Sequence, residues 1–301
     1  MLYNQVNKYM NDMIVDQPRL RKAMFKSKLE NTQRFFRLYL KSLALDFGLL
    51  KGHRHYTRFI ILGTARTGSN FLRSLLNSNS RILAFGELFR FYDSIGWDLP
   101  DYDRFFQSRT LVSLMQEDPA RFLEKRVFRK YPANISAVGF KIFYYHAQND
   151  TRKDVWNFLR NREDIKVIHL KRNNTLRLIL SLRIAHETDR WTDIDGTEEK
   201  NHVISISYED CLRAFTEKPK KEKQFDIAFQ NHDKIDVLYE DLSYDYEKEM
   251  KRIQDFLGIQ YEPLKPSTFK QAVLSLSKAI SNYFELKDRF RETPWIKFFE
   301  D

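Results

Sequence analysis

The sequence predicts an α/β protein built on a doubly wound, mostly parallel sheet with flanking helices. Short β-rich apolar runs alternate along the chain with longer segments of helical spacing, which is typical of parallel strands joined by helices. The expected strands are residues 59–62, 81–85, 137–141, 165–170 and 234–239. Gly and Pro are few, with 9 and 8 copies, which favours long helices and short loops. Ligands of such sheets bind at the carboxyl ends of the strands, so the residues that follow each strand are the first candidates for a site.

Helices are expected between and after these strands. Apolar residues recur at helical spacing from Phe71 to Leu76, directly after the first strand. The other expected helices are residues 102–131, with a break or a new first turn at Pro119, then 151–162, a helix that ends near 188, 244–257 and 270–290. Gly258 is expected to cap the helix over 244–257. Residues 202–207 are expected to form an edge or short strand, and residues 218–224 a charged surface loop.

The sequence predicts a helical N-terminal extension, residues 1–57, and one α/β domain, residues 58–301. The extension is heavily charged and has a rough apolar stripe that includes Phe35, Leu38 and Leu43. Three interpretations of it stay open: a helix packed on the core, an arm that makes a homo-oligomer, or a helix on a membrane surface. No residue of this extension suggests chemistry.

Charge and composition limit the classes of partner and compartment. The net charge is +10, from 51 basic and 41 acidic residues, which predicts an anionic partner. No zinc-finger spacing, RNP-like aromatic motif or long basic tract indicates nucleic acid. The sequence has no apolar run of about 18 residues and no signal pattern, so a soluble, cytoplasmic protein is expected. Cys211 is the one cysteine, which excludes an internal disulfide and a Cys-based zinc cluster.

The loop after the first strand has the features of an anion site. Gly63 and Gly68 keep the glycine spacing of a Walker A loop and precede a helix, whose first backbone N–H groups attract an anion. Ser69 and Asn70 stand where that loop has Lys and Ser or Thr, and the positive charge lies inside the loop at Arg66. A guanidinium can bind an anion through two hydrogen bonds, and Ser69 and Thr67 can add hydroxyl donors. The alternative is an ordinary strand-to-helix turn.

A second basic position follows the strand over 165–170. Lys171 and Arg172 come directly after it, and Ser181 lies on the next helix. A kinase or NTPase would have an acidic residue there to hold Mg²⁺, so these residues favour a second anion over a metal. The two positions together predict a ligand with two separate anionic groups.

The residues of both positions resemble a known family, the sulfotransferases that use 3′-phosphoadenosine-5′-phosphosulfate (PAPS). Thr64-Ala-Arg-Thr-Gly-Ser-Asn-Phe-Leu72 looks like the 5′-phosphosulfate loop, in the form found in carbohydrate and bacterial glycolipid or lipo-oligosaccharide enzymes. The segment from His169 to Ser181 looks like the 3′-phosphate motif. Val237–Leu242, with Phe256-Leu-Gly258 after the next helix, resembles a third segment. The resemblance implies a P-loop-like fold that binds PAPS without a metal.

The resemblance also implies roles for individual residues. The 5′-phosphosulfate would be held by Arg66, Thr67, Gly68, Ser69, Asn70 and Phe71. Arg172 and Ser181 would bind the 3′-phosphate, and Tyr239 would contact the adenine. Lys270 and Gln271 would line the cofactor from the C-terminal part of the chain. Arg66 stands where the small-molecule branch has Lys, which favours the carbohydrate-like branch.

Sulfuryl transfer needs a base for the acceptor hydroxyl and positive charge at the bridging oxygen. Glu87, just after the second strand, is the candidate base, and Arg66 the candidate cation. His146 is the competing base, because small-molecule members use a histidine. For the acceptor, the candidate binding residues are Lys141, His186 and Trp191.

The sequence therefore predicts an enzyme that moves a sulfuryl group from PAPS to a hydroxyl of a carbohydrate or glycolipid. Two alternatives remain. One is a non-catalytic module that binds a nucleotide bisphosphate. The other is a P-loop kinase, which would need a Lys at position 69 and an acidic residue after a central strand.

Overall fold

The computed structural model describes residues 32, 33, 36, 39–45, 47–148, 150–189, 202–265 and 274–300. The chain divides into two units, one of residues 1–53 with 130–132 and one of residues 54–129 with 133–301. In the described part of the smaller unit, residues 39–45 are helical, and β1 (Gly52–His53) pairs antiparallel with β4 (Tyr131–Pro132). Residues 1–31, which contain most of the expected N-terminal extension, lie outside the described residues.

A parallel sheet forms the centre of the larger unit and confirms the predicted fold class. Its described strands run in the order β3-β5-β2-β6-β7. The strands are β2 (Thr57–Gly63), β3 (Ile82–Glu87), β5 (Ala137–Phe143), β6 (Ile165–Lys171) and β7 (Lys234–Leu238). Because all five run in one direction, the residues that follow them meet at one edge of the sheet.

One irregularity in the sheet bears on the site. Phe85 pairs with Phe140, but the next pair is Glu87 with Lys141, so the register shifts at Gly86. A Cβ on Gly86 would come 2.1 Å from Asp98 Oδ2, and only glycine leaves room for that carboxylate. The bulge therefore brings Glu87, Lys141 and Asp98 to the same place.

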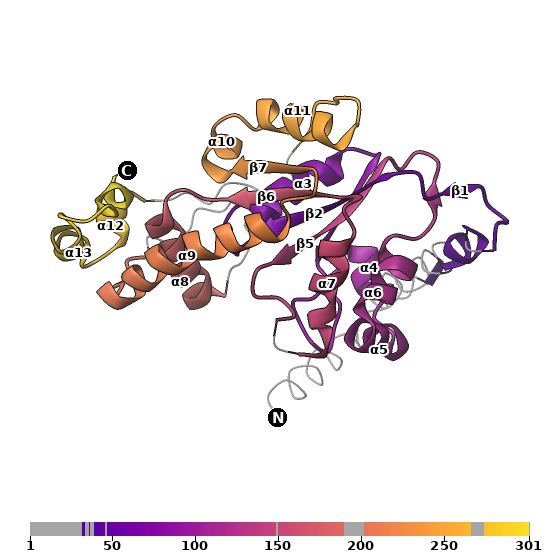
Figure 1. The fold of residues 1–301 in the computed structure, drawn as a ribbon, viewed down its shortest axis with the longest axis horizontal. Helices are drawn as coiled ribbons and strands as arrows, with labels where there is room; N and C mark the ends of the chain where they lie inside the picture. The colour runs from indigo at the N-terminus through magenta and orange to yellow at the C-terminus, as the bar shows by residue number, and fades with distance from the viewer. Residues whose placement is uncertain are drawn as a thin grey trace, which may run out of the picture. The chain divides into compact units, whose positions relative to one another are not determined.

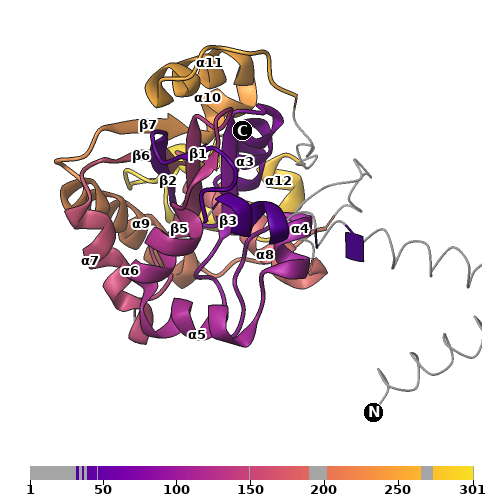
Figure 2. The same cartoon turned by 90° about the vertical axis from the view of Figure 1, so that its right-hand side faces the viewer.

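Helices cover both faces of the sheet, as Figure 1 and Figure 2 show. On one face lie α3 (Ser69–Ser78), α10 (Tyr239–Tyr244) and α11 (Tyr246–Leu257). On the other lie α4 (Pro100–Phe105), α5 (Arg109–Glu117), α6 (Pro119–Phe122), the π-helical turn Leu123–Val127, α7 (Asp154–Asn161), α8 (Thr175–Thr188) and α9 (Tyr208–Ala228). Short helical turns complete the chain at Thr151–Lys153, α12 (Leu276–Ala279), α13 (Tyr283–Arg289) and Ile296–Phe299.

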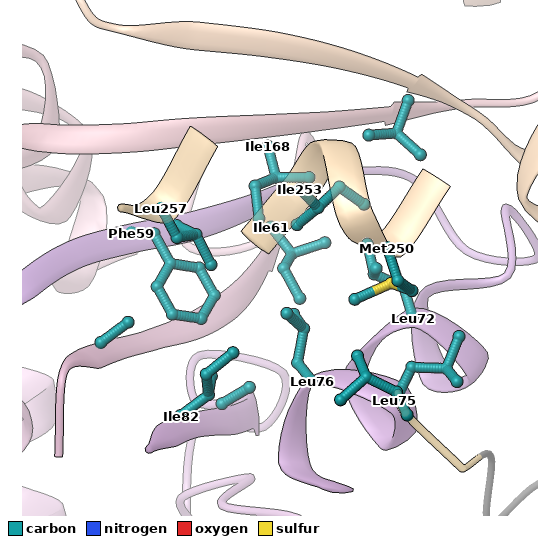
Figure 3. Close-up of a cluster of buried hydrophobic side chains, with 14 of the residues drawn as sticks. Phe59, Ile61, Leu72, Leu75, Leu76, Ile82, Ile168, Met250, Ile253 and Leu257 are labelled. Atoms are coloured by element: carbon teal, nitrogen blue, oxygen red, sulfur yellow. The ribbon is translucent and has the colours of Figure 1, made fainter. Parts of the chain in front are cut away.

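An apolar cluster joins the sheet to the first of these helical layers. Phe59 and Ile61 of β2 pack with Leu75 and Leu76 of α3 and with Ile253 of α11 (Figure 3). Their side chains are fully buried, and burying a side chain of this kind contributes about 1.5–3 kcal/mol. This packing fixes α3, and with it the loop that precedes α3, against the end of β2.

A second apolar cluster joins α8 and α9 to the C-terminal helices. Leu176, Phe215, Phe290 and Phe299 are among its buried members. Because α8 begins just after Arg172, the packing of α8 against the C-terminal helices fixes the second predicted anion position.

Three sequence expectations about the elements are wrong. Residues 218–224 lie within α9 and are not a loop. The helix continues past Pro219 because Phe215 and Phe225, before and after it, are both buried. Lys218 also pairs with Glu222 at 2.8 Å along the helix. Residues 202–207 hold only an isolated bridge from Ile204 to Ile280, since they pack against the C-terminal segment rather than along the sheet. The expected helix over 270–290 is interrupted in its described part at residues such as Asn282, and α12 and α13 are separate short helices. In contrast, the break predicted within 102–131 is confirmed, because α6 begins at Pro119 with Asp118 as its N-cap.

Gly258 caps α11 with φ 73°, as predicted. No helix in the described parts of the chain combines the length and apolarity needed to cross a bilayer.

Candidate active site

The loop between β2 and α3 has two residues in the left-handed backbone region. Arg66 has φ 64° and Gly68 φ 81°, and the first is uncommon for a residue with a Cβ. Gly68 is the N-cap of α3, and no side chain among the described residues caps this helix end. Backbone N–H groups at such a helix end favour an anion. Thr67 Oγ1 donates to the Thr64 carbonyl at 2.7 Å, so this hydroxyl closes the loop instead of facing outward.

The two predicted anion positions meet in space. Arg66 Nε donates to Ser181 Oγ at 2.8 Å, across 115 residues of sequence. Arg172 Nη1 donates to the Arg66 carbonyl at 2.9 Å. The pairing of β2 with β6 makes this possible, because it sets the two strand ends side by side. The sequence predicted both motifs, and the structure joins them into one site.

Tyr239 packs against both motifs. The Arg172 guanidinium carbon lies 4.4 Å from the centre of the Tyr239 ring, a cation–π distance. A Cβ on Gly68 would come 2.5 Å from the same ring. Gly68 is therefore needed for two reasons, its positive φ and the close approach of Tyr239.

The loop after β6 is fixed by α10 and by its own cap. Glu240 accepts hydrogen bonds from the backbone N–H groups of Asn173 and Asn174, each at 3.1 Å. Asn174 caps α8 by accepting from the Arg177 N–H at 3.0 Å. These bonds hold Arg172, whose side chain is buried and whose Nε has no hydrogen-bond partner among the described residues. A buried donor without a partner is costly, which marks Arg172 as a place for a ligand oxygen.

The prediction that Lys171 also faces a second anion is wrong. Lys171 Nζ lies 2.9 Å from Asp226 Oδ2 and 2.9 Å from Asp236 Oδ2, so acidic side chains already surround it. His169 belongs to the same cluster, with Nδ1 3.0 Å from Asp226 Oδ1 and Nε2 2.6 Å from the Tyr144 hydroxyl. Burial, assisted by the charge of Lys171, lowers the pKa of His169 to about 4.

A second polar group lies beside the loop, around a completely buried lysine. Lys141 Nζ donates to Asn70 Oδ1 at 2.5 Å and to Glu87 Oε1 at 3.2 Å. Asp98 Oδ2 lies 3.7 Å from the same nitrogen. Burial lowers the pKa of Lys141, and the carboxylates of Glu87 and Asp98 oppose that effect. Asn70 thus connects the anion loop to the candidate base.

His146 lies on the other side of the Glu87 carboxylate. Its Nε2 is 3.5 Å from Glu87 Oε2, and its Nδ1 accepts the Phe143 N–H at 3.1 Å. The neutral ring therefore has its hydrogen on Nε2, directed toward Glu87. Burial lowers the pKa of His146 to about 3, and the charges of Lys141, Arg152 and Arg90 act in the same direction.

Not every predicted site residue joins this group. The Phe71 ring packs edge-on against Tyr246 of α11, at 6.1 Å between centres, and belongs to the apolar cluster. His186 is exposed in the last turn of α8, about one and a half turns beyond Ser181. Trp191, Lys270 and Gln271 lie outside the described residues.

Two residues near the base were missed by sequence reasoning. Asp98 has φ 50°, and its carbonyl accepts from Arg73 Nη1 at 2.8 Å. Arg152 is buried and binds the backbone of the segment that follows Glu87. Neither stands in a motif or directly after a strand, so only the tertiary structure identifies them.

Comparisons with known proteins show which family this chain resembles. Residues 58–263 match the profile of the Sulfotransferase family. Nodulation protein H of Rhizobium tropici is 29% identical over 246 residues, which are 80% of this chain and 92% of that protein. Nodulation protein H of Rhizobium meliloti strain 1021 is 27% identical over 249 residues, 80% and 94% of the two chains. A sulfotransferase crystal structure from Alicyclobacillus acidocaldarius aligns at 15% identity with a TM-score of 0.46, covering 81% and 94%. The family profile spans well over half of the sequence, and the chain belongs to the sulfotransferase family.

Proposed function

We propose that this sulfotransferase moves a sulfuryl group from PAPS to a hydroxyl on a carbohydrate, glycolipid or lipo-oligosaccharide acceptor, with Glu87 as the general base. One observation carries the proposal. The loop of Arg66, the second motif of Arg172 and Ser181, and the Glu87–Lys141 pair all lie at one edge of the sheet.

The residues at this edge fit a ligand with two anionic groups. The uncapped N-terminus of α3 offers backbone N–H donors, and Arg66 adds a guanidinium within the same loop. Arg172 offers a buried Nε without a partner among the described residues. In this proposal Arg66, Gly68, Ser69 and Asn70 hold the 5′-phosphosulfate. Arg172 and Ser181 hold the 3′-phosphate, and Tyr239 lies against the adenine.

Bound PAPS supplies an activated sulfuryl group. Glu87 would accept the proton of the acceptor hydroxyl, and its side chain is 14% exposed, so a hydroxyl can reach it. Lys141 Nζ donates to Glu87 Oε1 at 3.2 Å, and His146 Nε2 lies 3.5 Å from Glu87 Oε2. Arg66 places positive charge where negative charge develops as the bond to the sulfuryl group breaks.

The geometry supports Glu87 over His146 as the base. The His146 Nδ1 lone pair already accepts a backbone N–H, and Nε2 is buried and holds the hydrogen. A ring with a pKa of about 3 also has little tendency to take a proton near neutral pH. His146 would instead orient Glu87.

The acceptor class rests on the form of the anion loop and on the relatives. Arg66 replaces the lysine of the small-molecule branch, and the loop resembles the carbohydrate-like branch. The matching relatives are named for nodulation and cover most of this chain. We therefore expect an acceptor that contains a sugar.

The test combines binding with transfer. The purified protein is titrated with 3′-phosphoadenosine-5′-phosphate in EDTA, beside ATP-Mg, and is then incubated with ³⁵S-labelled PAPS and a bacterial glycolipid and oligosaccharide extract. We expect bisphosphate binding and label transfer. Glu87→Gln should lower transfer by roughly 10²–10⁴-fold with bisphosphate affinity unchanged. Glu285→Gln, at an exposed position of α13, is the matched control.

Three outcomes would contradict the proposal. Binding of ATP-Mg without the bisphosphate would favour a kinase. Bisphosphate binding without transfer to any component would favour the non-catalytic module. Full transfer by Glu87→Gln would remove Glu87 as the base.

A further inference from the structure

We propose that an exposed aromatic surface beside Glu87 binds a sugar ring of the acceptor by stacking. The inference rests on the proposed function, because it places that ring next to the candidate base. The surface, called the aromatic platform below, consists of Arg90, Phe91, Tyr92 and Tyr145.

Three large aromatic side chains of the platform are exposed to solvent. The exposed fractions are 46% for Phe91, 49% for Tyr92 and 56% for Tyr145. Phe89, two residues before Phe91, is completely buried, so the chain changes from core to surface within this segment. Exposed aromatic residues grouped at a site commonly mark a place of binding.

Tyr145 places the platform beside the candidate base. The Tyr145 ring contacts the ring of His146, with 4.9 Å between centres. His146 Nε2 in turn lies 3.5 Å from Glu87 Oε2. One ring therefore separates Tyr145 from the Glu87 carboxylate.

Arg90 lies in the segment that leads from Glu87 to Phe91. Its backbone N–H donates to the Glu87 carbonyl at 3.0 Å, in the turn that follows β3. Its guanidinium carbon lies 4.6 Å from the centre of the Phe91 ring. β3 and β5 are paired neighbours in the sheet, with Glu87 opposite Lys141, so the segments that carry Phe91 and Tyr145 leave the same edge.

The segment that carries Phe91 and Tyr92 is held from beneath by Arg152. This buried side chain donates from Nη1 to the Phe89 carbonyl at 3.3 Å and to the Phe91 carbonyl, and its guanidinium carbon lies 5.1 Å from the Tyr92 ring. Asp150 fixes it through a 2.6 Å ion pair. A surface held in this way loses little entropy when a ligand binds.

The chemistry of the platform matches a sugar better than an acyl chain. Its apolar groups are flat rings with polar edges, and a guanidinium lies among them. A sugar ring has an apolar C–H face for stacking and hydroxyls at its rim that Arg90 and the tyrosine hydroxyls can bind.

The test separates the platform from the cofactor site. Glu87→Gln protein, saturated with 3′-phosphoadenosine-5′-phosphate, is applied to an array of immobilised neutral and acidic hexose oligosaccharides, and to phosphatidylcholine vesicles with and without anionic lipid. The same measurements are made after adding Phe91→Ala, Tyr92→Ala or Tyr145→Ala. Tyr244→Ala, 93% exposed on α10, is the matched control. Thermal unfolding and bisphosphate affinity are measured on each protein.

We expect sugar binding that each platform variant weakens by about tenfold or more, which is ~1.4 kcal/mol. The control should stay within about twofold of the parent, which is less than ~0.5 kcal/mol, and bisphosphate affinity and unfolding temperature should not change. Bisphosphate binding with no sugar bound, or sugar binding that the variants leave intact, would overturn the platform while leaving the proposed function standing. Vesicle binding that the variants abolish would assign the surface to lipid instead. Loss of bisphosphate binding in the parent protein would overturn the proposed function itself.

Discussion

Arg172 gives the sharpest test of the cofactor site, through the replacement Arg172→Met. Methionine is long enough to keep an apolar contact with the Tyr239 ring, which lies 4.4 Å from the guanidinium carbon. The replacement removes Nε, which is buried without a partner among the described residues, and the Nη1 bond to the Arg66 carbonyl. It therefore deletes the donors assigned to the 3′-phosphate while the neighbouring ring keeps its support.

The expected loss follows from the number of charged hydrogen bonds. A hydrogen bond to a charged group contributes about 1.5–3 kcal/mol, and Arg172 has at least one donor free for a phosphate oxygen. A loss of about 2–3 kcal/mol corresponds to roughly 30- to 140-fold weaker binding of 3′-phosphoadenosine-5′-phosphate. Adenosine 5′-phosphate lacks the 3′-phosphate, so its affinity should change little.

Calorimetric titration of both nucleotides measures this difference directly. Arg183→Met, which removes an exposed arginine from the same helix, is the control and should leave both affinities within about twofold, less than ~0.5 kcal/mol. An equal loss for the two nucleotides would mean that Arg172 serves only to shape the loop through Arg66. No loss for either would place the 3′-phosphate elsewhere.

Three further predictions concern stability and reactivity. Burial lowers the pKa of His169 to about 4 in the native protein, compared with about 6.5 in the unfolded chain. Between these two pH values the unfolded chain binds a proton that the native protein does not. The neutral His169 therefore contributes ~3 kcal/mol to the free energy of unfolding near neutral pH, and this contribution is lost as the pH falls from about 6.5 to 4. Urea unfolding at pH 7 and pH 4.5 should show that the free energy of unfolding depends less on pH in His169→Gln than in the wild type. The same pH dependence in both proteins would refute this prediction. Arg152→Met should lower the free energy of unfolding by about 2–3 kcal/mol, because it removes a buried guanidinium from the partly exposed Asp150 and leaves two carbonyls without their donor. A loss under about 1 kcal/mol in urea denaturation would contradict this. Burial raises the pKa of Cys211 to about 12, so a thiol reagent should label it at pH 7.5 only after unfolding, and rapid labelling of the native protein would contradict its buried position.

The sequence was sufficient for the fold class, and it led to the prediction of two anion motifs. Strand positions were predictable because buried parallel strands are short apolar runs, and the end of α11 was predictable because a glycine there adopts positive φ. The loop around Arg66 and the segment from Arg172 to Ser181 could be found because their residue types and order suit phosphate binding. These are local properties, and a sequence records them directly.

Local rules failed where distant segments decide the outcome. A run of charged residues predicts a surface loop over 218–224, yet α9 runs through this segment because its buried face packs on other helices. Lys171 is the neighbour of Arg172 at the end of β6, yet acidic residues from α9 and β7 surround its ammonium group. Neither result can be read from nearest neighbours.

The tertiary structure alone decided how the site is assembled. Strand pairing brought Arg66 and Ser181 within 2.8 Å, and the shift in register at Gly86 placed Glu87 opposite Lys141. Both depend on contacts between residues that are far apart in the chain. The residue types were therefore fixed by the sequence, while their distances, burial and partners were set by the packing of the sheet and its helices.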